Sequence, residues 1–230
     1  GPDGTFHLVW TSSWRGDKGF GYASSKDLIH WSEERFISVM DHEPTTVNVW
    51  APELFYDNEQ KQYIIIWASC IPGRFEKGLE EDSNNHRMYY TTTPDFKKFS
   101  ETKLFLDPGF SVIDAVIVKR AKNDYVLVLK DNTRPERNIK AAFSSSPLGP
   151  WKAHAANPVK SDIRSARPAV RFFRREGRLI RRAQNCSRCF GGPLVLCEVV
   201  DLTPYTFREM FINDIRPEWM PGNSRIHTLS

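Results

Sequence analysis

Short runs of aromatic and β-branched residues recur along the chain at similar intervals, and polar turns separate them. The runs start at four positions: Phe6, Tyr63, Tyr125 and Leu179. These starts lie 57, 62 and 54 residues apart, and turn signals such as Glu176-Gly177 lie between the expected strands. No helical spacing of apolar residues is sustained, so the pattern predicts an all-β fold.

Three of the repeats also contain a similar closing phrase, which is a short strand, a polar turn and an aromatic residue nine positions after the start. Three segments carry this phrase: Tyr22–Trp31, Tyr90–Phe99 and Ala142–Trp151. Another recurring segment is expected to form the inner strands: Trp50–Tyr56, Ile113–Val118 and Ala166–Phe172. About four short strands in each period of roughly 50 to 65 residues are typical of a β-propeller. A β-sandwich is the alternative, but it would not explain the repeated closing phrase.

The repeats set the expected domain organisation. We expect one β-propeller domain over residues 1–230, with blades at about 1–45, 46–108, 109–160 and 161–222, and residues 223–230 as the start of a closing blade. An inner strand before Phe6 and the continuation of the last blade are missing from this pattern. A propeller closes its ring because each blade buries both faces against its neighbours, so we expect a five-bladed type that is incomplete at both ends.

Composition narrows the class of protein. With 40% hydrophobic and 26% charged residues, the chain is expected to fold rather than to be disordered. It has no run of about 18 apolar residues, so we expect no membrane span. The net charge of +4 conceals a break: residues 1–160 carry a net −1 and residues 161–230 a net +5, and all 12 basic residues of the second part are Arg. This change suggests two segments with different histories.

The Arg-rich segment and its cysteines allow two further interpretations. Its Arg residues alternate with apolar residues over 171–175 and 178–182, as in a two-faced strand, and we therefore expect no nucleic-acid partner. Cys186 and Cys189 form a Cys-x-x-Cys pair. Cys197 offers a third sulfur, but no His is suitably spaced, so we expect structural thiols or one disulfide and no metal site.

Several motifs resemble those of glycoside hydrolase family 43, the five-bladed propeller enzymes that cut arabinose- and xylose-containing glycans. The resemblance covers about residues 1–155 and is carried by residues 1–10, Trp50–Glu53, Ser111–Ala115 and the closing phrases. Residues 165–168, 184–187 and 227–230 are more similar to a related propeller domain found near glucosamine inositolphosphorylceramide transferases. The family resemblance implies secretion or a periplasmic location. It requires no cofactor and allows a structural cation at the propeller axis.

Inverting glycoside hydrolysis needs a carboxylic acid and a carboxylate base on opposite faces of the sugar bond, and a third carboxylate can tune the pKa of the acid. The resemblance assigns this third role to Asp114, which lies in an apolar strand. The family's base would lie upstream of Gly1, and Asp3, in a turn, is no substitute. Ala166 occupies the position of the family's acid. Two of the three catalytic groups are therefore not found in this chain.

Other side chains are candidates for contact with a glycan. Trp50 and Trp14 are expected to stack on a sugar ring, although a core role is an equal alternative for each. The polar candidates for substrate contact are Glu53, Arg87, Arg134, Arg167 and His227. Packing against neighbouring blades is the alternative for Glu53, and an ion pair with Asp114 is expected for Arg167. We expect Asp114, Glu53 and Arg167 to project toward one central cleft.

Three functions remain open from the sequence. The first is a hydrolase-like protein of the arabinofuranosidase or xylosidase type that acts on plant-type polysaccharides or oligosaccharides, with impaired inverting hydrolysis. The second is a non-catalytic glycan-binding propeller, and the third is an accessory domain of a sugar-transfer enzyme. All three predict a carbohydrate partner, and the missing carboxyl groups predict very weak hydrolysis or none by this chain alone.

Overall fold

The computed structural model describes residues 1–133, 138–189 and 191–216, and these residues form strands joined by turns and loops. Their only helical segment is a single 3-10 turn, η1 (Asp82–Asn84), which confirms the all-β class. None of the described residues forms a helix with the length and apolar character to cross a membrane. Contacts divide the chain into two compact units, residues 1–113 and residues 114 onwards.

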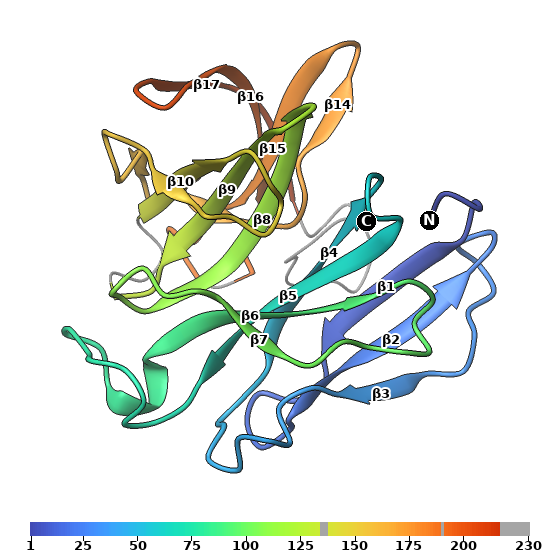
Figure 1. The fold of residues 1–230 in the computed structure, drawn as a ribbon. Coiled ribbons are helices and arrows are strands. Elements are labelled where there is room, and N and C mark those ends of the chain that lie inside the picture. Colours follow the sequence, from blue (N-terminus) through green and yellow to red (C-terminus); the bar gives the residue numbers. More distant parts are fainter. Residues whose placement is uncertain (134–137, 190, 217–230) are drawn as a thin grey trace. The chain divides into compact units, whose positions relative to one another are not determined.

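The first unit contains two antiparallel sheets in which each strand pairs with the next along the chain (Figure 1). The first sheet has three strands: β1 (Phe6–Thr11), β2 (Gly19–Ser25) and β3 (Arg35–Ser38). The second has four strands: β4 (Trp50–Asp57), β5 (Gln62–Cys70), β6 (His86–Thr93) and β7 (Lys103–Leu106). Such meanders of three or four strands are the pattern expected for propeller blades.

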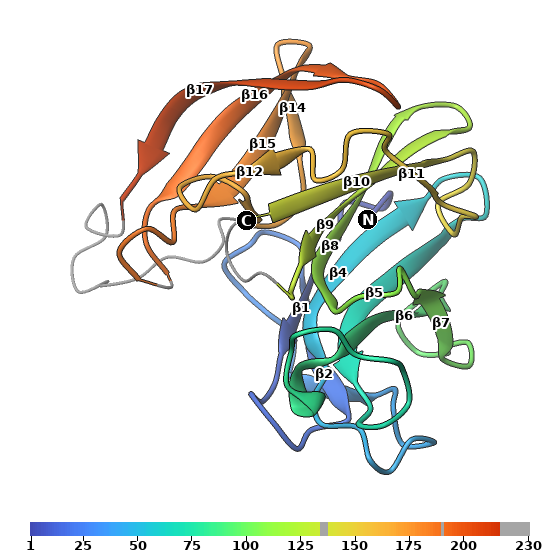
Figure 2. The same cartoon turned by 90° about the vertical axis from the view of Figure 1, so that its left-hand side faces the viewer.

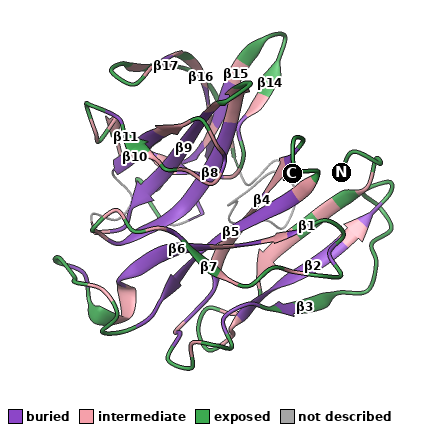
Figure 3. Ribbon diagram, viewed as in Figure 1, coloured by how far each residue is buried: buried purple, intermediate pink, exposed green. Residues whose placement is uncertain are grey.

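The core of this unit lies between its two sheets. Strand β5 is apolar on both faces, and Tyr63, Ile65 and Trp67 point to one of them because side chains alternate along a strand. These three side chains join a buried cluster with Phe20 and Tyr22 of β2. Figure 3 shows β5 as an almost continuously buried strand. The aromatic and β-branched runs of the sequence thus supply the side chains that pack the two sheets against each other.

The second unit also contains two sheets, each a meander with one additional short strand (Figure 2). Its first sheet contains β8 (Val112–Ala121, which starts in the first unit), β9 (Asp124–Asp131), β10 (Asn138–Ser144), β11 (Lys152–Ala153) and β12 (Lys160–Ser161). Its second sheet contains β13 (Arg167–Pro168), β14 (Phe173–Arg175), β15 (Arg178–Gln184), β16 (Leu194–Leu202) and β17 (Phe207–Ile215). The expected closing segment at 223–230 lies outside the described residues.

The core of the second unit joins β8, β9 and β10 to the segment around β13. Val116, Val126 and Ile139 from the first of these sheets are buried in one cluster with Ala166 and Phe172. Ala166 has no exposed surface. The segment Ala166–Phe172, which was expected to form an inner strand, therefore also contributes side chains to the core.

The first two closing phrases form the same turn. In the first, Ser25 Oγ accepts hydrogen bonds from the backbone N–H groups of Asp27 and Leu28. The Asp27 carboxylate accepts two more, from Ile29 and His30. Leu28 has a φ of +67°, so the turn contains one residue in the left-handed backbone conformation.

The second closing phrase repeats this hydrogen bonding. Thr93 Oγ1 accepts from Asp95 N and Phe96 N, and the Asp95 carboxylate accepts from Lys97 N and Lys98 N. The residue after the aspartate, Phe96, again has a positive φ, of +57°. These backbone hydrogen bonds hold the pKa of Asp95 below its ordinary value. The repeated sequence therefore encodes a repeated turn, in which Ser/Thr and Asp supply the acceptors.

Candidate functional site

Asp114 lies near the start of β8, within an apolar environment. The residue is 9% exposed, and Val112, Ile113 and Ala115 around it are buried. Its φ is +52°, in the left-handed region that few residues other than Gly adopt, although Asp tolerates it better than most. A buried carboxylate on a strained backbone is typical of a functional position.

The ion pair expected between Asp114 and Arg167 is present. Arg167 Nε lies 3.2 Å from Asp114 Oδ2, and the two side chains are 10% and 8% exposed. Arg167 is the first residue of β13, so the pair joins the inner strands of the two sheets of this unit. A carboxylate that tunes a neighbouring acid does so through its negative charge. In this chain the guanidinium of Arg167 compensates that charge.

The residue before Arg167 offers no proton donor. Ala166 is completely buried in the apolar cluster of the second unit, and its backbone N–H donates to Asp162 O at 2.7 Å. This short hydrogen-bonded turn fixes Ala166 in the core. The position that the family resemblance assigns to the acid is therefore occupied by a packed methyl group.

The carboxyl groups near this turn are held in the ionised form. Burial acts to raise the pKa of Asp162, but a hydrogen bond from Ser165 at 2.7 Å and bonds from Arg164 outweigh it and lower the pKa. A general acid needs its pKa raised toward neutrality. Asp162 therefore does not replace the missing acid.

Glu209 of β17 is the other buried carboxylate of this region. Arg181, itself 0% exposed, donates from Nε and Nη2 to the two Glu209 oxygens at 2.7 Å each, and Lys160 pairs with the same carboxylate. Burial raises the pKa of Glu209, but the bonds and charges of Arg181 and Lys160 more than offset this and lower it. The cluster holds β12, β15 and β17 together. Arg181, one of the 12 Arg residues of the segment 161–230, thus has a structural role in the protein interior.

Three aromatic rings of the first unit, those of Trp14, Trp50 and His86, lie against one another and form what we call the ring stack, in which the Trp14 ring is tilted by 36° to that of Trp50. The Trp50 ring lies 4.5 Å from that of Trp14 and 4.7 Å from that of His86, measured between centroids. Trp50 Nε1–H donates to Trp14 O at 2.8 Å. Trp14 is 67% exposed, whereas His86 is fully buried. The stack therefore presents an indole at the surface and fixes its inner end.

Hydrogen bonds orient the buried end of this stack. His86 Nε2 lies 3.1 Å from Asn48 Nδ2, and His86 Nδ1 lies 2.9 Å from Asn84 O. His86 was not among the candidates from the sequence, although the next residue, Arg87, was. Because neighbouring residues of a strand point to opposite faces, His86 and Arg87 of β6 have different surroundings.

Glu53 and Trp50 lie on the same strand, β4. Glu53 is half-buried on β4 and follows a register shift between Trp50 and Glu53. The positive φ found at Asp114 recurs at Ala51, where it is +48°. The backbone counterpart of Asp114 on β4 is therefore Ala51, and Glu53 lies two residues further along. The common cleft expected for Asp114, Glu53 and Arg167 stays a prediction.

Arg87 has a packing environment instead of an exposed one. It is 1% exposed, and its guanidinium donates to Asn85 Oδ1, to backbone carbonyls and to the Asp107 carboxylate. It also lies 4.7 Å from the centroid of the Phe75 ring. Arg87 is therefore held by protein partners in the first unit, and its contact with a glycan stays a prediction. Arg134 and His227 lie outside the described residues.

The cysteines and other potential ligands form no metal site in the residues that the structure describes. No group of three His, Cys, Asp or Glu side chains is arranged to hold an ion there. All four cysteines are free thiols; Cys186 is buried and Cys189 is exposed. Burial raises the pKa of the Cys197 thiol to about 11. The Cys-x-x-Cys pair is therefore two thiols in different environments.

Comparison with known families gives one match over most of the chain. The family model described as a probable glycosyl hydrolase domain, of the kind related to glycoside hydrolase family 43, matches residues 7–181. This match crosses the charge break at residue 160, so residues on both sides belong to one domain type.

Curated relatives fall into the two groups that the sequence motifs suggested. Glucosamine inositolphosphorylceramide transferase 1 of Oryza sativa subsp. indica is 36% identical over 77 residues, which is 33% of this chain and 10% of that protein. The Arabidopsis thaliana protein of the same name is 31% identical over 105 residues, or 43% and 14%. An α-L-arabinofuranosidase of Bifidobacterium longum subsp. longum is 24% identical over 104 residues, or 41% and 10%. The alignments span about a tenth of the length of these relatives.

Solved structures share the fold at low sequence identity. The family 117 glycoside hydrolase Zg3597 of Zobellia galactanivorans gives a TM-score of 0.66 at 13% identity, covering 93% of this chain and 67% of that one. The catalytic domain of the Coprinopsis cinerea GH62 α-L-arabinofuranosidase gives 0.60 at 15%, covering 99% and 70%. These likenesses confirm the propeller class predicted from the repeats.

Proposed function

Because this chain belongs to the family of probable glycosyl hydrolase domains related to glycoside hydrolase family 43, we propose that it binds arabinose- or xylose-containing glycans and hydrolyses them very weakly or not at all. Binding is assigned to the exposed end of the Trp14–Trp50–His86 stack. The loss of hydrolysis is assigned to the Asp114 region.

The ring stack supports the binding half of this proposal. The C–H faces of sugars suit aromatic faces, and a preorganised ring binds with little loss of side-chain entropy. Trp14 is 67% exposed and rests on Trp50, which is itself stacked on the hydrogen-bonded His86. Such a supported, exposed indole is suited to cover one face of a glycosyl ring.

One observation carries the catalytic half, namely the ion pair of Asp114 with Arg167 at 3.2 Å, next to the buried Ala166. Inverting hydrolysis requires a protonated carboxyl group beside the leaving oxygen. The family resemblance assigns that group to position 166, where this chain has a methyl group, and the guanidinium of Arg167 compensates the Asp114 carboxylate. In the described part of the chain, each carboxyl group with a displaced pKa has it lowered, which favours the ionised form and opposes proton donation.

A second candidate function is an accessory domain of a sugar-transfer enzyme. It is favoured by the relatives named glucosamine inositolphosphorylceramide transferase, which reach 31 to 38% identity. Under this alternative the chain would prefer a glucosamine-containing glycoside to xylotriose. A direct comparison of the two ligands by isothermal titration calorimetry distinguishes the candidates.

The binding proposal is tested with Trp14→Ala. Stacked aromatic contacts contribute about 0.5–1.5 kcal/mol beyond area burial, so the variant should bind xylotriose or an arabinofuranosyl oligosaccharide roughly 2- to 12-fold more weakly. The matched control is Trp31→Ala, because Trp31 is also exposed, at 40%, in the same unit but outside the stack. An equal loss in both variants, or no binding by the unmodified chain, would refute the assignment.

A further inference from the structure

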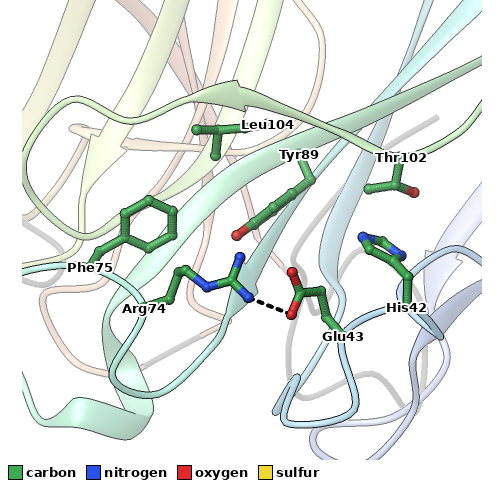
Figure 4. A pocket seen from close by; sticks show the side chains of 7 residues that line it. All are labelled: His42, Glu43, Arg74, Phe75, Tyr89, Thr102 and Leu104. Carbon is green, nitrogen blue, oxygen red and sulfur yellow. Dashed lines mark hydrogen bonds and ion pairs between the residues drawn. The ribbon is translucent and has the colours of Figure 1, made fainter.

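The first unit contains a pocket that shares no residue with the ring stack or with the Asp114–Arg167 pair. Its volume is about 340 Å³, at the lower end of the range for small-molecule sites. The lining side chains come from the β3–β4 loop, the β5–β6 loop, β6 and the region of β7: His42, Glu43, Arg74, Phe75, Tyr89, Thr102 and Leu104 (Figure 4). Four separate segments thus converge on one cavity.

Tyr89 is the buried polar group of this pocket. The residue is 6% exposed, and its hydroxyl makes no hydrogen bond to the part of the protein that the structure describes. Figure 4 shows that hydroxyl directed between Phe75 and the Arg74–Glu43 pair. A buried hydroxyl without a partner is costly, and native structures normally satisfy it. Burial also raises the pKa of Tyr89 to about 12, so the hydroxyl keeps its proton near neutral pH and can donate it.

An ion pair between Arg74 and Glu43 lies beside the Tyr89 hydroxyl, and its two charges offset each other. Arg74 Nη2 donates to Glu43 Oε2 at 2.6 Å, and the side chains are 48% and 18% exposed. The pair brings both acceptor oxygens and donor N–H groups to the pocket without a net charge. An anionic ligand would meet Glu43 and a cationic ligand would meet Arg74, so a neutral ligand with several hydroxyl groups fits best.

Phe75 supplies a fixed apolar wall. The guanidinium of Arg87 lies 4.7 Å from its centroid, and Arg87 is held by Asn85 and Asp107. Leu104, 47% exposed, adds apolar surface at the pocket. Apolar walls combined with a few convergent polar groups suit a ligand with C–H faces and hydroxyl edges.

We propose that this pocket is a second carbohydrate-binding site, which takes one neutral glycosyl residue and satisfies the Tyr89 hydroxyl with a sugar oxygen. The ligand's C–H face lies against Phe75, and its remaining hydroxyl groups bond to Glu43 and Arg74. The proposal requires no hydrolysis and does not depend on the ring stack at Trp14.

The test is Tyr89→Phe, which removes only the hydroxyl group. Binding of methyl β-xyloside and xylotriose is followed by amide chemical-shift changes at the pocket residues. A lost hydrogen bond of about 0.5–1.5 kcal/mol weakens binding at the pocket roughly 2- to 12-fold. Urea denaturation should show stability unchanged or increased, because the hydroxyl lacks a protein partner. A structural role for the hydroxyl predicts the opposite, namely a loss of stability.

Tyr90→Phe is the matched control, because Tyr90 is the next residue of β6 and points to the opposite face. It should leave pocket binding unchanged. Trp14→Ala distinguishes the two sites. It should weaken glycan binding at the ring stack and leave glycan binding at the pocket unchanged. The proposal is overturned if Tyr89→Phe leaves the pocket shifts unchanged, if it destabilises the protein, or if glucuronate or inorganic phosphate binds the pocket more tightly than methyl β-xyloside.

Discussion

Replacing Arg167 with Gln would leave the Asp114 carboxylate buried without its counter-charge. The charged atoms are 3.2 Å apart and the side chains are only 10% and 8% exposed. At an effective dielectric constant of about 20, their attraction is roughly 5 kcal/mol. Removing one partner of a buried pair typically costs about 3–5 kcal/mol. We therefore expect Arg167→Gln to lower the free energy of unfolding by about 3 kcal/mol.

A double-mutant cycle measures this interaction directly. Asp114→Asn should also destabilise the protein, and Asn is the suitable replacement because it tolerates the φ of +52° at this position. The double variant removes both charges and should lose less than the sum of the single losses, with a coupling energy of at least about 2 kcal/mol. The assay is urea denaturation at pH 7 followed by circular dichroism. Additivity within about 0.5 kcal/mol would refute a direct interaction.

Three further predictions concern the second unit. Glu209→Gln should reduce stability at pH 7 by about 3 kcal/mol; because the folded-state pKa of Glu209 is lowered, its contribution is present above the unfolded pKa and is lost as pH falls through the folded pKa, so urea midpoints from pH 7 to pH 3 should fall less in the variant. Ala166→Glu should destabilise the protein by several kcal/mol, since it places a carboxylate in an apolar cluster, whereas Ala166→Ser should cost less; equal urea midpoints for Ala166→Glu and the parent would contradict this. At pH 8 an aromatic disulfide reagent should label Cys189 rapidly and Cys197 only after denaturation, because Cys189 is exposed and the pKa of buried Cys197 is raised to about 11; equal labelling rates would be inconsistent with this.

The fold was predictable because its signal is periodic. In the first two repeats the same phrase recurs at Ser25–Asp27 and at Thr93–Asp95, and it makes the same hydrogen bonds. The division into two compact units near Asp114 was not predictable, because it depends on which distant segments pack together and not on where strands occur.

The candidate site was predictable only at Asp114 and Arg167, which the motifs shared with the resembling family single out. Arg167 directly follows Ala166, the position that the family resemblance assigns to the acid, and its expected pairing with Asp114 is present. Burial of Arg87 was not predictable, because charged residues are seldom fully buried and its partners come from separate segments. His86 and Tyr89 were missed for a similar reason: their contacts join residues that are distant in the sequence.

The most direct test of the central claim measures hydrolysis and binding on one preparation of the 230-residue chain. Release of the aryl group from an aryl α-L-arabinofuranoside and an aryl β-D-xyloside is compared with that of Asp114→Asn, and glycan binding is compared with that of Trp14→Ala. We predict that Asp114→Asn releases no less than the unmodified chain, with both close to the buffer blank, and that glycan binding falls in Trp14→Ala. Robust turnover by the unmodified chain that Asp114→Asn abolishes would contradict the account.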